Sequence, residues 1–156
     1  MAKTLTIPIG ELLPHDPPMI LIDRMLEADE TSNLCEVVIK PSSMFLEDKG
    51  VPVFVAIEYM AQAIAAHAGY STRLAGGPVK VGFLLGTPRF NAYQAYFPLG
   101  TRYQVRIERD WGDDELMRFN CSITRTSDDC LFAEAGLNVF QPKDLEAYLA
   151  SKQYSL

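Results

Sequence analysis

A nearly unbroken run of apolar residues, 53–68, constrains the fold of this chain more than any other feature of the sequence. Its length favours a helix, and the "AGGP" that follows ends one, so we predict a single helix from residue 53 to about residue 74. Glu58, Gln62 and His67 interrupt the run, which is also too short to cross a membrane. A helix that is apolar on most sides is buried on several sides, so this segment is predicted to lie at the centre of the fold.

Strand-like segments stand on both sides of the predicted helix. Two precede it, "MILIDRMLEAD" and "NLCEVVIKP", and four follow it, "VKVGFLLGTPRF", "TRYQVRIERDW", "ELMRFNCSITR" and "CLFAEAGLNVF". The turn signals "WGDD" and "TSDD" predict antiparallel hairpins. One antiparallel sheet wrapped around one long helix is the α+β architecture called the hotdog, and we expect residues 1–156 to form a single such domain with a short terminal helix at 143–152. Because one sheet of this kind covers the helix only partly, an obligate dimer is expected.

The composition excludes several classes of partner and site. A formal net charge of -6 argues against nucleic acid and against a membrane surface as the main partner. Three cysteines without CxxC spacing predict neither a disulfide framework nor a zinc site, and two distant histidines leave no clear ligand set for any metal. The first residues contain no apolar signal region, so we expect a cytoplasmic protein.

Three motifs resemble those of one enzyme family. "LLPHDPPMILIDRM" at 12–25 is similar to an N-terminal signature of leucine-leucine-proline-histidine, then a proline, aliphatics and aspartate-arginine. "EYMAQ" at 58–62 is similar to a central-helix motif, and "PRF" at 88–90 with "FPLG" at 97–100 is similar to a further pair. From about residue 11 to residue 140 the chain therefore resembles the 3-hydroxyacyl-(acyl carrier protein) dehydratases of the FabZ/FabA type. It looks like a divergent subgroup, most similar to dehydratase-like proteins encoded with aryl-polyene pigment synthases.

The resemblance implies a hydro-lyase that removes water from a 3-hydroxyacyl thioester in fatty-acid or polyene-type synthesis. No cofactor is implied beyond the phosphopantetheine arm of an acyl carrier protein, which carries the substrate. The family's catalytic histidine, fourteen residues before the helix glutamate, is replaced here by Met44. The family's glycine at the helix start, whose backbone N–H polarises the thioester carbonyl, corresponds to Val53, which crowds that approach but keeps an N–H. The implied substrate-binding residues are Gln62, Val53, Pro52, Met44 and Phe45.

Elimination of water needs a base at C2, an acid at the C3 hydroxyl and a donor for the thioester oxygen. Glu58 is the candidate acid because burial in the apolar run would favour its protonated form; alternatively it only hydrogen-bonds across a dimer interface. His67, nine residues along, falls near the opposite face of the helix and is expected to be structural. His15, in a proline-bounded loop, is the candidate base, although it would alternatively only pack against or bond that loop. Gln62, on the same face as Glu58, orients the carboxylate, binds the leaving hydroxyl, or is a satisfied core amide.

Three functions remain open, although the "LLPHDPP" and "EYMAQ" signatures favour the dehydratase lineage over the third. The first is a dehydratase that uses Glu58 and His15, with His15 within roughly 6 Å of Glu58. The second is a catalytically weak or silent partner subunit of a dehydratase heterodimer, which Met44 favours. The third is a hotdog thioesterase, in which the helix acid activates water. The chain would form a homodimer or a heterodimer with another hotdog subunit, and a basic surface for an acidic carrier protein is predicted at Arg89, Arg102 and Arg106, unless these form only a solvated strand face.

Overall fold

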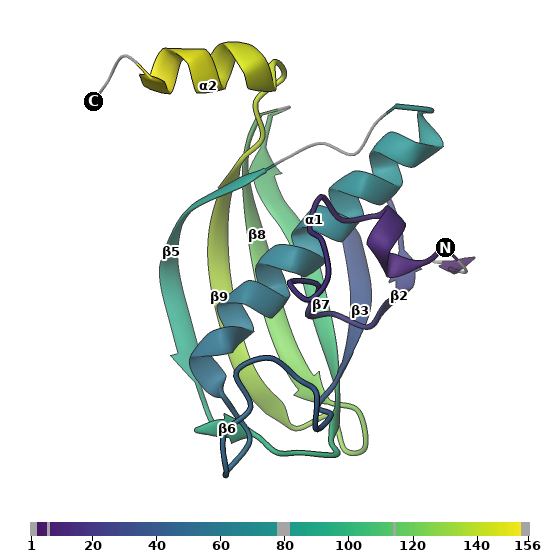
Figure 1. Cartoon of the computed structure of the whole chain (residues 1–156), viewed down its shortest axis with the longest axis vertical. Coiled ribbons are helices and arrows are strands. Elements are labelled where there is room, and N and C mark those ends of the chain that lie inside the picture. Colours follow the sequence, from purple (N-terminus) through teal and green to yellow (C-terminus); the bar gives the residue numbers. More distant parts are fainter. Residues whose placement is uncertain (1–2, 6, 78–81, 114, 154–156) are drawn as a thin grey trace.

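The computed structural model describes residues 3–5, 7–77, 82–113 and 115–153. Within these residues, seven strands form one antiparallel sheet in the order β1-β2-β3-β7-β8-β9-β5, and the long helix α1 crosses one face of it diagonally (Figure 1). A separate two-stranded sheet pairs β4 with β6 beside the start of α1. The bounds are β1 Lys3–Thr4, β2 Arg24–Ala28, β3 Ser32–Val38, β4 Val51–Pro52, α1 Ala56–Leu74, β5 Phe83–Ala92, β6 Tyr96–Phe97, β7 Arg102–Gly112, β8 Leu116–Arg125, β9 Leu131–Phe140 and α2 Leu145–Gln153. This architecture confirms the predicted hotdog fold.

The predicted elements differ from the observed ones mainly at their ends. The central helix ends at Leu74 as predicted, but Val53–Val55 form a short 3-10 turn before the α-helix begins. The first strand was predicted from residue 19 and begins only at Arg24, because the backbone of residues 19–21 bonds to α1 instead of to a neighbouring strand. Another 3-10 turn, Ile9–Glu11, lies before the N-terminal signature.

The core lies between α1 and the middle of the sheet. On β7, Tyr103, Val105 and Ile107 are buried beneath the helix, whereas Arg102 and Arg106 point away from it. This alternation is what a strand with one solvated face requires. The side of α1 that faces β5 is less covered, because the helix diverges from that edge of the sheet (Figure 1).

The N-terminal segment reaches α1 at a point where only a glycine fits. A Cβ atom on Gly69 would collide with the backbone carbonyl of Leu12, and Leu12 is itself fully buried. This close approach fixes how the segment that follows Leu12 runs along the helix. It therefore determines which residues of that segment can reach the side chains of α1.

Substituting Gly69 tests this close approach. Helix propensity alone predicts that Gly69→Ala stabilises α1 by about 1 kcal/mol. We expect instead a loss of about 1–3 kcal/mol in the free energy of unfolding, because the backbone of Leu12 must move. Gly10→Ala is the control, since the nearest atom to its Cβ would lie 3.8 Å away. Urea unfolding midpoints measure both, and a stabilised Gly69→Ala variant would contradict this close packing.

Candidate active site

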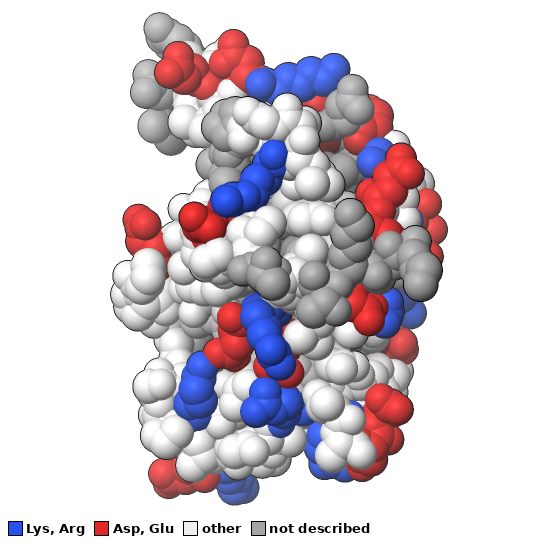
Figure 2. All heavy atoms as spheres, turned by 90° about the vertical axis from the view of Figure 1, so that its right-hand side faces the viewer, with Lys and Arg blue, Asp and Glu red and all other residues white. Residues whose placement is uncertain are grey.

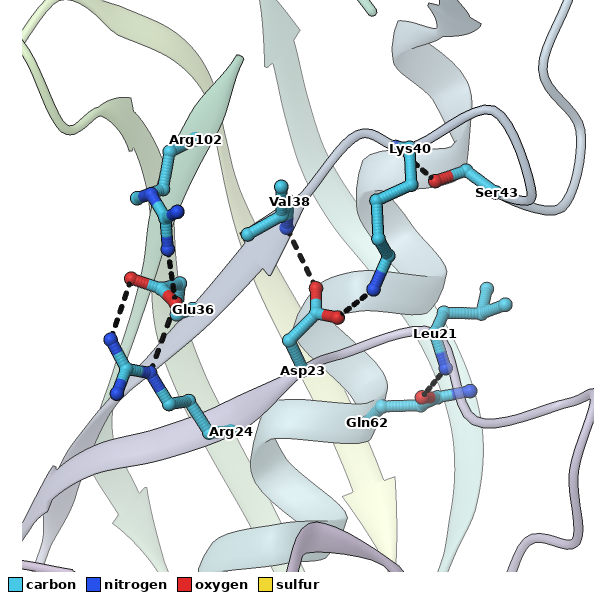
Figure 3. Close-up of polar contacts among 9 residues, drawn as sticks. All are labelled: Leu21, Asp23, Arg24, Glu36, Val38, Lys40, Ser43, Gln62 and Arg102. Carbon is cyan, nitrogen blue, oxygen red and sulfur yellow. Dashed lines mark hydrogen bonds and ion pairs between the residues drawn. The ribbon is translucent and has the colours of Figure 1, made fainter. Parts of the chain in front are cut away.

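Gln62 joins the N-terminal segment to α1. Its side chain is 0% exposed, and its amide takes part in bonds with three groups. The backbone N–H of Leu21 donates to Oε1 at 2.8 Å, while Nε2 lies 2.6 Å from the carbonyl of Met19 and 3.1 Å from Oε1 of Glu58. Figure 3 shows the amide beneath Leu21. Gln62 is therefore a satisfied core amide that also holds the Glu58 carboxylate, so these two readings of the residue apply.

His15 and Glu58 lie close together across this junction. Nε2 of His15 is 4.0 Å from Oε1 of Glu58, which falls inside the expected limit but is longer than a hydrogen bond. Nδ1 of His15 is buried and has no bonding partner among the described residues. The imidazole is thus positioned by packing, with Nε2 as the nitrogen that faces the carboxylate.

The expectation that Glu58 is buried is wrong for the single chain. Its side chain is 42% exposed and that of His15 is 29% exposed. The physical reason is the orientation of α1, since Glu58 lies on the side of the helix that the sheet does not cover. Further shielding of this carboxylate has to come from a substrate or from another subunit.

The prediction that the backbone N–H of Val53 binds the thioester oxygen is also wrong. The backbone N–H of Val53 already donates to the carbonyl of Ala95 at 2.9 Å, continuing the pairing of β4 with β6. Pro52 is buried in β4, where it pairs with Tyr96. The N–H of Val53 is therefore not free to bind a thioester oxygen.

Met44 lines a cavity to which neither Glu58 nor His15 contributes. It lines a space of about 300 Å³ together with Asp23, Lys40 and Tyr59. Burial, and then the Asp23 carboxylate, raise the pKa of the Tyr59 hydroxyl, which therefore stays protonated. Phe45 is exposed and has a φ of 69°, a left-handed backbone that is uncommon for a bulky residue. Within one chain, Met44 and Phe45 are not gathered with Glu58 and His15.

The aspartate-arginine pair of the N-terminal signature has a structural role that the sequence did not reveal. Asp23 accepts a bond of 2.7 Å from the backbone N–H of Val38 and pairs with Lys40 (Figure 3). Arg24 pairs with Glu36, a carboxylate that is only 5% exposed. The sequence feature that could have indicated this role is the pair of adjacent charged residues inside an aliphatic segment. They fix the end of β3 and the path of the chain into β2.

The three arginines predicted to dock a carrier are spread across the sheet. Arg102 donates to Glu36 at 2.8 Å, on the outer face that it shares with Arg106. Arg89 lies on β5, at the edge of the sheet and three strands from β7. Figure 2, which shows the right-hand side of Figure 1, has its basic side chains interspersed with acidic ones. Their proximity in sequence therefore does not translate into a single basic patch.

The remaining candidate groups are accounted for by the fold. Nε2 of His67 lies 2.8 Å from the carbonyl of Asp29, in agreement with its predicted structural role. Burial raises the pKa of the Cys35 thiol to about 12, and that of Cys121 likewise to about 12. Across the described residues, no group of three or more histidine, cysteine or acidic side chains is placed to hold a metal ion. In the same part of the chain, no helix combines the length and the apolar character needed to cross a membrane.

Replacing Gln62 tests whether this amide anchors the loop. Gln62→Leu removes the partners of the Leu21 N–H and the Met19 carbonyl, and each buried group left unpaired costs about 1–3 kcal/mol. We expect a lower free energy of unfolding and faster hydrogen exchange at the Leu21 amide. Gln94→Leu, on an exposed loop, is the control. Unchanged stability together with unchanged exchange at Leu21 would contradict the anchoring role.

Comparison with solved structures agrees with the fold described above. The chain matches a chain of the dehydratase heterocomplex ApeI:P from Xenorhabdus doucetiae with a TM-score of 0.84 and 24% identity, covering 94% of this chain and 98% of that one. It also matches a hypothetical thioesterase from Streptococcus pneumoniae, with coenzyme A, at a TM-score of 0.61 and 12% identity, covering 76% of this chain and 84% of that one. The PaaI protein of E. coli matches at 0.60 and 9% identity, covering 78% and 79%. At these identities the likeness establishes the fold alone.

Sequence comparison identifies the family. No curated protein matches the chain at a significant level. The family model described as "ApeP-like: ApeP dehydratase" matches residues 7–150, which is well over half of the chain. The matched region includes the N-terminal signature, α1 and the whole of the sheet that follows the helix. The chain therefore belongs to the ApeP-like dehydratase family.

Proposed function

We propose that this chain removes water from 3-hydroxyacyl thioesters carried on the phosphopantetheine arm of an acyl carrier protein, in the cytoplasm. Glu58 is the acid and His15 is the base. The observation that carries the proposal is the 4.0 Å approach of Nε2 of His15 to Oε1 of Glu58, with that carboxylate held by Gln62. Membership of a dehydratase family supports the same reaction.

The pair accounts for both proton transfers of the reaction. His15 takes a proton from C2 through Nε2, and the C2 electron pair forms the new C2–C3 double bond as the C3–O bond breaks. Glu58 gives its proton to the departing oxygen, so the products are a 2-enoyl thioester and water. His15 then carries an extra proton and Glu58 has lost one. Because the two groups are close, a proton can return from the imidazolium to the carboxylate directly or through one water and reset the site.

Next to the occupied N–H of Val53, another backbone N–H is available to bind the thioester oxygen. At the start of a helix the first N–H groups have no helical partner. The N–H of Phe54 follows that of Val53 directly, and the side chain of Phe54 is exposed. The positive end of the α1 dipole favours negative charge at the same place. We assign the N–H of Phe54 the role that Val53 cannot fill.

Carrier docking is assigned to the outer face of β7. Arg102 and Arg106 point from the same face of that strand, and the carrier is acidic. Arg102 already forms an ion pair with Glu36. Arg106 is therefore expected to contribute more to attraction of the carrier. Arg89, on the edge strand β5 and three strands from β7, would act only at a second contact.

A partner subunit of a heterodimer is the second candidate function. Two observations favour it, the methionine at the position of the usual histidine and the exposed side chains of Leu84 and Leu85 on the edge strand β5. An unpaired apolar edge strand is a site for pairing with another chain. The similar solved chain comes from a heterocomplex named as a dehydratase. In this arrangement Glu58 would face a base supplied by a second hotdog subunit, which would also shield its exposed carboxylate.

Substitution of the proposed pair tests the assignment of roles. With a 3-hydroxyacyl carrier-protein substrate, Glu58→Gln and His15→Ala should each lower kcat by about 10²–10⁴-fold, the usual contribution of a positioned acid or base. Glu27→Gln, an exposed carboxylate on β2, is the matched control and should keep wild-type kcat. A fully active Glu58→Gln variant would exclude this residue as the acid.

Comparing the chain alone with the chain in a mixed assembly separates the two candidate functions. We expect the purified chain to release water from the substrate without any other hotdog subunit, and His15→Ala to lower the rate by about 10²–10⁴-fold. The second candidate predicts no water loss from the chain alone, enhancement of a separate hotdog dehydratase, and no effect of His15→Ala on that enhancement. The measurement is the rate of 2-enoyl thioester formation in each mixture.

A further inference from the structure

The β2–β3 hairpin places a polar side chain beneath α1. Asn33 lies on β3 and is only 2% exposed. Its Nδ2 donates to the carbonyl of Ala63 on α1 at 2.8 Å. Ile107, the neighbour of Asn33 in register on β7, is fully buried and apolar, as most residues under a helix are. An amide at this place in the core therefore needs a physical explanation.

The Asn33 amide is not there to stabilise the core. Its Oδ1 is buried and has no bonding partner among the described residues. A buried acceptor without a partner costs free energy. The Ala63 carbonyl does not need Asn33, because a carbonyl inside an α-helix accepts from the N–H four residues further along. An apolar side chain at position 33 would leave no polar atom unpaired.

Hydrogen bonds fix the position of α1 on the sheet more closely than its apolar contacts do. The buried residues of α1 include the small side chains of Ala56, Ala63 and Ala66, each 0% exposed. Apolar contacts have no preferred direction, so contacts of such small groups oppose sliding of the helix only weakly. A hydrogen bond, in contrast, requires a distance and an angle within narrow limits. The bond from Asn33 therefore restricts where α1 can lie.

A second bond joins the same hairpin to α1. Nε2 of His67 lies 2.8 Å from the carbonyl of Asp29, in the turn between β2 and β3. Because a carbonyl can only accept, Nε2 is the donor. His67 is four residues after Ala63, so the two bonds hold successive turns of α1. Two bonds one turn apart oppose both sliding and rotation of the helix.

The position of α1 on the sheet determines the distance between the proposed acid and base. Glu58 moves with α1. The loop that carries His15 is bonded to α1 through Gln62, but the chain after the loop is bonded to the end of β3 through Asp23. The loop therefore cannot follow α1 freely if the helix shifts along the sheet. Such a shift changes the 4.0 Å separation of the pair, and a misplacement of about 1 Å can lower a rate about 10²-fold.

We propose that Asn33 is a positioning residue for the dehydration, which holds α1 so that Glu58 and His15 both reach the substrate. His67 acts in the same way from the next turn of the helix. The inference rests on the proposed function, because it takes Glu58 and His15 as the reacting pair. It also accounts for the unpaired Oδ1, since a residue that costs stability is retained where activity depends on it.

Replacing Asn33 separates positioning from stability. Asn33→Leu removes the bond to Ala63 together with the unpaired Oδ1. With a 3-hydroxyacyl carrier-protein substrate, we expect kcat to fall about tenfold to a hundredfold with little change in KM, while the urea unfolding midpoint rises. Asn120→Leu, at an exposed position on β8, is the matched control and should keep wild-type kcat. A lower midpoint with unchanged kcat would show that Asn33 is only structural, which would overturn the inference.

His67 offers a second pair of variants that does not depend on how a leucine fits at position 33. His67→Gln keeps a side-chain N–H that can donate to the carbonyl of Asp29, whereas His67→Leu has no donor. We expect His67→Gln to retain most of the wild-type kcat and His67→Leu to lose about tenfold. Equal kcat values for the two variants would contradict positioning by this bond.

An NMR measurement tests the geometry without any reaction. The chain has only two histidines, so the His67→Gln variant assigns the Hε1 signal of His15. Removing the nearby charge with Glu58→Gln should move this signal in the wild-type chain, and should move it less in the Asn33→Leu background, where the pair is displaced. An equal movement in both backgrounds would overturn the inference. If the movements differ as expected but the wild-type chain releases no water, only the proposed function is contradicted.

Discussion

The rest of this structure depends on one buried amide. Gln62 is four residues from Glu58 on α1, and it bonds both to that carboxylate and to the backbone of the N-terminal loop. A buried amide left without partners is costly, so loop and helix stabilise each other in one arrangement. Because the loop carries His15, the same bonds determine which side chain meets Glu58. The proposed catalytic pair is thus a consequence of how two distant segments satisfy one polar group.

Other contacts keep the N-terminal segment on the path that Gln62 requires. Before the loop, the backbone of Leu12 passes over Gly69, where no side chain would fit. After the loop, Asp23 bonds the backbone of Val38 and so ties the chain to the end of β3. The loop is held at both ends and in its middle. A histidine that has no hydrogen-bonding partner at Nδ1 among the described residues can still be well positioned in such a loop.

The sequence was sufficient for the fold because its main signals are local. The apolar run, the glycine-proline stop and the turn signals predict the central helix and the hairpins without knowledge of tertiary contacts. Features that depend on tertiary contacts were missed. The N–H of Val53 is occupied because β4 pairs with β6, and Met19–Leu21 look like a strand but bond a glutamine side chain. Glu58 was expected to be buried because its neighbours in sequence are apolar, whereas the direction of its helix face decides its exposure.

The chain belongs to a dehydratase family but has a methionine at the usual histidine position. The central question is therefore whether His15 and Glu58 act together. A double-mutant cycle on kcat answers it most directly, with Glu58→Gln and His15→Ala measured singly and together. Residues that act as one unit are strongly non-additive, so the double variant should be no slower than the slower single variant. If the two losses multiply, or if His15→Ala alone has no effect, the two residues do not form a catalytic pair.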